Sequence, residues 1–208
     1  NVRQLWNAEG CWEYLRVPGN DSIIIGGTYT GLARFVKKGE RWAFDQKIAG
    51  FEESCRDLVF DKNNDLWMTH GYKGIFRLSF NQAFDSVKNF THYGKSHGLD
   101  SPLGNFMFSY QGDILVSRPD SILKYNYLKN SFEYNKSYTE TFGGSGVSRV
   151  HRDKYNNLWY FPANTSRLKV KLAANSPWEQ GQFDILRKLD NRFVGGFEHI
   201  HVIDDHNI

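Results

Sequence analysis

The sequence is poor in proline, methionine and cysteine, and it contains no long apolar run. Its 208 residues include 5 prolines, 2 methionines and 2 cysteines. Disulfide scaffolds need a much higher density of cysteine, so we expect Cys11 and Cys55 to be free thiols. No stretch approaches the roughly 20 apolar residues of a membrane-spanning helix. We therefore expect any membrane attachment to lie in segments outside these residues.

Charge of one sign is also lacking, as are the common catalytic motifs. The 26 basic and 23 acidic residues nearly balance and form no basic cluster, so the sequence gives no reason to expect nucleic acid as a partner. There is no HExxH motif and no phosphate-cradling loop. The segment 144–146 contains a serine between two glycines but lacks the strand-and-helix context of a nucleophile elbow. We expect no catalytic residues, no metal and no cofactor.

Aromatic residues and glycine are abundant, and together they favour short strands joined by tight turns. Aromatic residues make up 16% of the chain, and glycine occurs 19 times. Aromatic side chains pack on pleated surfaces, whereas glycine adopts positive φ in turns. Helical periodicity is weak throughout, and residues 79–86 could form one helical turn at most. A solenoid of alternating strands and helices is therefore disfavoured.

A repeat organises the chain. Residues 56–69 form an apolar strand, an Asp/Asn-rich turn and a second strand, and residues 149–161 repeat this order. Leu66-Trp67 and Leu158-Trp159 lie 92 residues apart, which is two units of 46. Four short strands in each of several consecutive units are typical of β-propeller blades. The units are predicted at roughly 11–53, 54–103, 104–146 and 147–197, with the start of another at 198–208.

The predicted fold is therefore all-β, a single β-propeller segment over residues 1–208 with blades of four antiparallel strands. About four and a half blades are present. This number would leave an open sheet edge with unpaired backbone groups. We expect the chain to be part of a larger propeller.

The turn motif is similar to that of a known family. The stretch from Asp61 through Leu66-Trp67 to the later Gly74-Ile75-Phe76 resembles the two-component regulator propeller repeat. The copy at Leu158-Trp159 matches the first half of that pattern and departs after it, and the central copy lacks the tryptophan. The resemblance implies a seven-bladed propeller in the extracytoplasmic sensor part of a Bacteroidetes-type hybrid histidine kinase or related regulator. It also implies an oligosaccharide ligand, a periplasmic location, anchoring in the inner membrane and a possible homodimer of the full-length protein.

Two features of the repeat have structural rather than functional interpretations. The run from Asp61 to Asp65 superficially resembles a calcium loop, but it lacks the glycine and glutamate of that motif. Because similar turns recur at 153–157 and 204–207, we interpret them as hairpin turns. Trp67 and Trp159 each fall within a second strand and are expected to pack between blades.

Candidate ligand-binding residues follow from the position of the loops. In propellers, ligands usually meet the loops between the second and third strands and those entering the first strand. Aromatic rings that stack on sugar faces, beside polar groups that pair with hydroxyls, suit a saccharide. The rim candidates in these loops are Tyr29, Arg56, His70, Tyr72, Lys73, Arg118, Arg149, Asn164, Arg167 and His199. The same loops also carry Trp12, Glu53, Asn105, Asp120 and Glu198.

Three hypotheses remain open. The favoured one is a non-catalytic sensor segment that binds an oligosaccharide or another small ligand. The second is a propeller enzyme acting on a carbohydrate or lactone, with Glu53 and Glu198 as a possible carboxylate pair. The third is a protein-binding scaffold. His199 and His201 could share one face of a strand, but no third metal ligand can be located.

Overall fold

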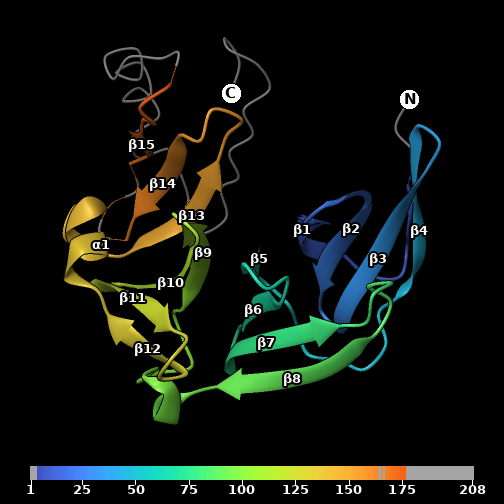
Figure 1. Cartoon of the computed structure of the whole chain (residues 1–208), viewed down its shortest axis with the longest axis horizontal. Coiled ribbons are helices and arrows are strands. Elements are labelled where there is room, and N and C mark those ends of the chain that lie inside the picture. Colours follow the sequence, from blue (N-terminus) through green and yellow to red (C-terminus); the bar gives the residue numbers. More distant parts are fainter. Residues whose placement is uncertain (1–3, 164, 166, 177–208) are drawn as a thin grey trace. The chain divides into compact units, whose positions relative to one another are not determined.

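The computed structural model describes residues 4–163, 165 and 167–176 (Figure 1). By its internal contacts the chain divides into two compact units. The first unit comprises Asn1–Val116 and Lys124–Glu133, and the second comprises Ser117–Leu123 and Tyr134–Ile208.

The described strands form four small antiparallel sheets, and within each sheet the strands lie in sequence order. The first sheet contains β1 (Cys11–Val17), β2 (Asn20–Thr28), β3 (Gly31–Lys38) and β4 (Arg41–Lys47). The second contains β5 (Leu58–Phe60), β6 (Leu66–His70), β7 (Gly74–Phe80) and β8 (Val87–Tyr93). The third contains β9 (Phe106–Tyr110), β10 (Asp113–Arg118), β11 (Ser121–Asn126) and β12 (Ser131–Tyr134), and the fourth shows β13 (Val147–Arg152), β14 (Leu158–Pro162) and β15 (Lys169–Lys171).

Consecutive four-stranded antiparallel meanders are the blades of a β-propeller, so the predicted fold class is confirmed. The strand expected after β15 and the unit expected to start at 198–208 lie outside the described residues. The total number of blades and the boundaries of the repeats stay predictions.

Residues 79–86 agree with the expectation of one helical turn at most. No helix forms there: β7 continues to Phe80, and the Asn81 side chain closes a turn by accepting a hydrogen bond from the amide of Asp85 at 3.1 Å. The short helices lie elsewhere, at η1 (Lys95–His97) and α1 (Lys136–Thr141). Asn135 begins α1 because its side chain accepts a hydrogen bond from the amide of Tyr138 at 2.8 Å. Among the described residues, no helix has the length and apolar character needed to cross a membrane.

The core of the first unit lies between the first and second sheets. The alternating residues of their strands bury one face of each sheet against the other. Ile25 and Leu32 of the first sheet and Leu66, Met68 and Leu78 of the second are all fully buried in one cluster. The first and second sheets are therefore held together by apolar side chains on their facing surfaces. These side chains alternate along each strand with residues that point to the other surface of the same sheet.

The opposite face of β6 packs on the third sheet through Trp67. Its ring lies 4.5 Å from that of Tyr125 and 5.7 Å from that of Phe132, measured between centroids. Trp67 and, in the second unit, Trp159 are both fully buried. The prediction that these tryptophans belong to the core is confirmed, and for Trp67 the contact between blades is direct.

The Asp/Asn-rich turns at 61–65 and 153–157 are hairpin turns, as predicted, whereas the one predicted at 204–207 lies outside the described residues. Asp61 Oδ1 accepts hydrogen bonds from the amides of Asn63 at 2.8 Å and Asp65 at 3.1 Å. Asp153 Oδ1 makes the same pair of bonds in the fourth sheet, to Tyr155 at 2.8 Å and Asn157 at 3.0 Å. Each aspartate therefore accepts the amides of its own turn with Oδ1, while its Oδ2 accepts the indole N–H of Trp67 or Trp159. This is Asx-turn chemistry rather than metal coordination.

Candidate functional site

The first unit brings five of the predicted rim residues together. Tyr29 lies in the turn between β2 and β3, His70 ends β6, and Tyr72 and Lys73 follow in the turn before β7. Arg56 lies in the segment that enters β5. With two neighbours, these residues form what we call the rim cluster: Trp12, Tyr29, Glu53, Arg56, His70, Tyr72 and Lys73.

Arg56 lies at the centre of the rim cluster, over two aromatic rings. Its guanidinium carbon is 5.0 Å from the ring centroid of Trp12 and 5.9 Å from that of Tyr72. Gly71 makes this position possible, because a Cβ atom there would lie 2.9 Å from the guanidinium carbon. The arrangement is a cation–π contact of one guanidinium with two rings.

The backbone next to Arg56 is fixed by the end of β6. The amide of Arg56 donates to the carbonyl of Thr69 at 3.0 Å, and the amide of Thr69 donates to the carbonyl of Asp57 at 3.1 Å. The hydroxyl of Thr69 also donates to Asp57 Oδ2 at 2.8 Å. These bonds hold the segment of Arg56 beside the turn that carries His70 and Tyr72.

Two tyrosine rings of the rim cluster are open to solvent. Tyr29 is 57% exposed and Tyr72 is 73% exposed. Tyr29 also contacts Trp12, with ring centroids 4.7 Å apart. The Trp12 indole N–H is buried and has no hydrogen-bond partner among the described residues, so ring contacts rather than a hydrogen bond hold this side chain.

Glu53 is engaged by two basic side chains, Lys73 and His70. Lys73 Nζ lies 2.7 Å from Glu53 Oε1 and 2.8 Å from Oε2. His70 Nε2 lies 3.4 Å from Glu53 Oε2. The carboxylate therefore has its own partners within the rim cluster.

His70 is a structural acceptor in the neighbouring turn. Its Nδ1 accepts hydrogen bonds from the amides of Tyr72 at 2.9 Å and Lys73 at 3.1 Å, which places the proton of the neutral ring on Nε2. Burial lowers the pKa of His70 below its ordinary value, and the opposing charge of Glu53 does not restore it. At neutral pH the ring is therefore uncharged.

The other rim candidates lie in the second unit or outside the described residues. Arg118 ends β10, Arg149 lies at an irregularity of β13 with φ 52°, and Arg167 is exposed before β15. Asn164 and His199 lie outside the described residues. The rim cluster thus contains only part of the predicted set.

The predicted pairs that involve the C-terminal residues are likewise outside the described part of the chain. Glu198, the expected partner of Glu53, lies there, as do His199 and His201. Within residues 4–163, 165 and 167–176, no three histidine, cysteine or acidic side chains come together as a metal site would require. Both cysteines are free thiols, and burial raises the pKa of Cys55 far above its ordinary value, so this thiol is unreactive.

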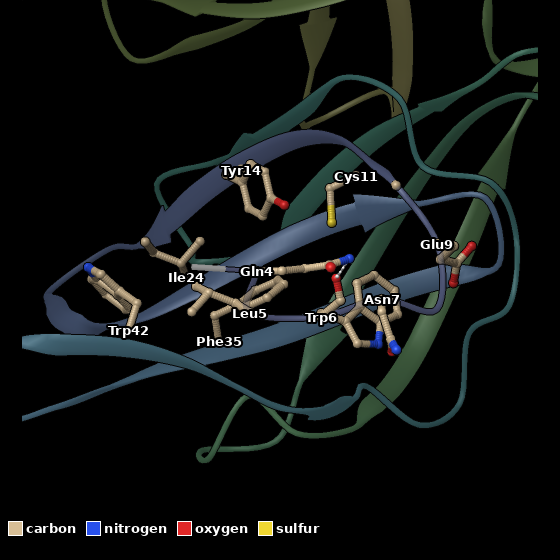
Figure 2. Close-up of a pocket in the computed structure, with 11 residues that line it drawn as sticks. Gln4, Leu5, Trp6, Asn7, Glu9, Cys11, Tyr14, Ile24, Phe35 and Trp42 are labelled. Atoms are coloured by element: carbon tan, nitrogen blue, oxygen red, sulfur yellow. Dashed lines mark hydrogen bonds between the residues drawn. The ribbon is translucent and has the colours of Figure 1, made fainter. Parts of the chain in front are cut away.

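A pocket of about 620 Å³ lies on the first sheet, and no residue of the rim cluster lines it. Figure 2 shows Gln4, Leu5 and Trp6 beside Tyr14, Phe35 and Trp42. Trp6 stacks on Phe44 with ring centroids 5.1 Å apart, and Glu9 forms an ion pair with Lys47 at 2.7 Å. These contacts hold the N-terminal segment against the sheet.

The register of the sheets explains this pocket. The hairpin-closing pairs Thr28–Gly31 and His70–Gly74 are equivalent, so Ile24 and Phe35 of the first sheet correspond to Leu66 and Leu78 of the second. Leu66 and Leu78 are fully buried against the neighbouring sheet. We therefore interpret the pocket as part of a blade-packing face, rather than as a ligand site.

Sequence reasoning named Trp12 and Glu53 but missed Gly71 and the residues that line the pocket. Gly71 stands in the turn Gly71-Tyr72-Lys73-Gly74, where one glycine was enough to predict the turn. The significance of Gly71 depends on Arg56, which reaches it from another strand entry. No local signal could have shown this contact.

Comparisons with known proteins support the fold. No family model matches the chain, and no curated protein matches it in sequence. One similar solved structure is the extracellular domain assigned to a one-component system of B. thetaiotaomicron, with a TM-score of 0.52, 16% identity, 96% of this chain covered and 28% of that chain. Another is the extracellular domain assigned to a hybrid two-component system of the same organism, with a TM-score of 0.51, 12% identity, and 77% and 22% of the two chains covered.

A third similar structure is an auxiliary nutrient-binding protein from Bacteroides ovatus, with a TM-score of 0.50, 11% identity, and 80% of this chain and 39% of that chain covered. The chain therefore spans between about a fifth and two fifths of the length of these structures. The first two belong to the class of regulators that the sequence motif resembles. At these identities, what the likeness shows is the β-propeller fold.

Proposed function

We propose that this chain is a ligand-sensing propeller segment of an extracytoplasmic regulator and that the rim cluster binds an oligosaccharide. The observation that carries the proposal is the convergence of Tyr29 and Tyr72, both exposed, around Arg56 and the Glu53–Lys73 pair. Exposed rings stack on the apolar faces of sugars, and fixed polar groups beside them select hydroxyl positions. The solved structures of extracellular regulator domains and of a nutrient-binding protein support a role in recognition.

In this proposal the full-length protein is anchored in the inner membrane and faces the periplasm. The ligand would bias the packing of blades, and this bias would act on a dimeric output module outside the chain. Blades in one unit share a single apolar core. A ligand bound to the turns of one blade would therefore change the packing of the neighbouring blade.

The rim cluster fits binding better than hydrolysis. Glycoside hydrolysis requires two carboxyl groups placed on either side of the scissile bond. Glu53 is the acidic residue of the cluster, and Lys73 and His70 already engage it. An enzyme acting on a carbohydrate or lactone and a protein-binding scaffold remain the competing functions.

The test is isothermal titration calorimetry with a panel of neutral and acidic oligosaccharides, together with analysis of the products. We expect binding without turnover, and we expect Tyr72→Ala and Tyr29→Ala each to weaken it about fivefold, because each removes about 1 kcal/mol of ring contact. Tyr134→Ala is the matched control, since Tyr134 is also exposed (60%) but lies outside the rim cluster. Turnover, or equal losses in all three variants, would contradict the proposal.

A further inference from the structure

We propose that the ligand of the rim cluster carries a carboxylate and that Arg56 binds it, so that the site selects an acidic saccharide of the uronic-acid type. This inference rests on the proposed function and names the substrate class for the same site. Three observations carry it: the lack of an anionic partner for Arg56, the way its guanidinium is held, and the net charge of the rim cluster.

Arg56 has no anionic partner in the described part of the chain. Its side chain takes part in no ion pair or hydrogen bond there, although its backbone amide is bonded to Thr69. The carboxylate of its own cluster, Glu53, is occupied by Lys73 at 2.7 Å. A guanidinium has five N–H donors and no acceptor, so these donors are available to a ligand.

The guanidinium of Arg56 is held in place by rings rather than by a counter-charge. The rings of Trp12 and Tyr72 lie 5.0 Å and 5.9 Å from its central carbon, and Gly71 leaves the room that the group needs. Cation–π contact uses the face of the guanidinium and leaves its N–H edge for hydrogen bonds. A planar carboxylate can accept two parallel bonds from such an edge.

The charge balance of the rim cluster also favours an anionic ligand. Glu53 and Lys73 compensate each other, and His70 is neutral at neutral pH. The positive charge of Arg56 remains uncompensated within the cluster. A ligand with one carboxylate near this residue and a sugar ring near Tyr72 would satisfy both features at once.

The experiment compares three uronic-acid oligosaccharides, those of galacturonate, glucuronate and mannuronate, each as the free acid and as the methyl ester. Calorimetry at neutral pH measures the affinity of each pair for the whole chain. We expect at least one free acid to bind about tenfold or more tightly than its own ester, because esterification removes the charge-assisted bonds.

Two variants test whether Arg56 causes this preference. Gly71→Ala keeps all charges but drives the guanidinium from its position, and Arg56→Lys keeps the charge but loses the planar edge. Both are expected to abolish the preference for acid over ester, so that each variant binds the two forms of one oligosaccharide with equal affinity. Gly10→Ala is the control for a glycine substitution, because a Cβ there meets nothing within 4 Å, and thermal unfolding verifies that each variant is folded.

The outcomes separate this inference from the proposed function. Equal binding of acids and esters would overturn the inference and leave oligosaccharide binding standing. Failure of every acid, ester and neutral oligosaccharide to bind would overturn both. Complete competition by millimolar inorganic phosphate, with no stronger binding of any saccharide, would show a simple anion site and would also overturn the inference.

Discussion

The buried turn at Asp61 supports a quantitative prediction about stability. The Asp61 side chain is inaccessible to solvent. Its Oδ2 accepts hydrogen bonds from Trp67 Nε1 at 2.9 Å and from the hydroxyl of Tyr127 at 3.2 Å, and Arg77 lies 3.5 Å away. Asp61 therefore connects the core tryptophan of the second sheet with a tyrosine that follows β11 of the third.

Asp61→Asn changes one atom of this network and leaves its shape. The other oxygen must still accept the backbone bonds of the turn, so the new amide group faces the donors of Trp67 and Tyr127. Each buried donor left without an acceptor costs about 1–3 kcal/mol, so we expect the free energy of unfolding to fall by about 2–4 kcal/mol. For a chain of this size that corresponds to roughly 5–15 °C in Tm.

The assay is urea unfolding followed by tryptophan fluorescence, with Asp65→Asn as the matched control. Asp65 also pairs with Arg77, at 2.6 Å, but its side chain is partly exposed, so we expect its loss to cost only about 1 kcal/mol. Burial and then the charge of Asp61 raise the pKa of Tyr127, and absorbance titration should show this pKa falling in Asp61→Asn. Equal costs for the two variants would refute the reasoning, because the donors would then be satisfied without the carboxylate.

Two further predictions concern the first unit. Gly27→Ala should cost several kcal/mol, because its Cβ would lie 2.5 Å from the carbonyl oxygen of Cys55, whereas Gly10→Ala should change urea unfolding by less than about 0.5 kcal/mol. The pKa of His70 is lowered by burial from 6.5, so its contribution to stability is complete above pH 6.5 and declines as the pH falls through the folded-state pKa. His70→Asn should therefore lose less stability than the unchanged protein between pH 7.5 and 5, and parallel pH profiles of the two in thermal unfolding would contradict this.

The strands and turns of the blades could be predicted because their signals are local. Alternating apolar residues define the strands, and Asp61 and Asp153 define hairpin turns through bonds to amides two and four residues away. The helix α1 was missed because it has only 6 residues, too few for a periodic apolar pattern. Local sequence patterns were therefore sufficient to predict the strands and hairpin turns, but not to predict a helix as short as α1.

The candidate site could be predicted only in part, because its geometry depends on contacts between distant residues. The loops at 29, 56 and 70–73 follow from the order of strands in each repeat. The placement of Arg56 over Trp12 joins positions that are 44 residues apart, and it also needs the space left by Gly71. The sequence shows that Arg56 lies in a loop, but not that its side chain has no anionic partner in the part of the chain that the structure describes.

Successive residues of β6 and of the turn that follows it connect the core of the fold with the proposed site. Trp67 is buried in the middle of β6, and Thr69, two residues later, fixes the segment of Arg56 through Asp57. Asp57 Oδ2 also accepts a hydrogen bond from the amide of Met107 in β9 at 3.4 Å. The group that places Arg56 in the rim cluster therefore also contacts the next blade. In the proposed function, a ligand bound to the guanidinium would act on this junction between two sheets. The exposed Tyr72 lies beyond the hydrogen bonds of Thr69 and Asp57. We therefore expect its substitution to change ligand binding without disturbing the contact between the two sheets.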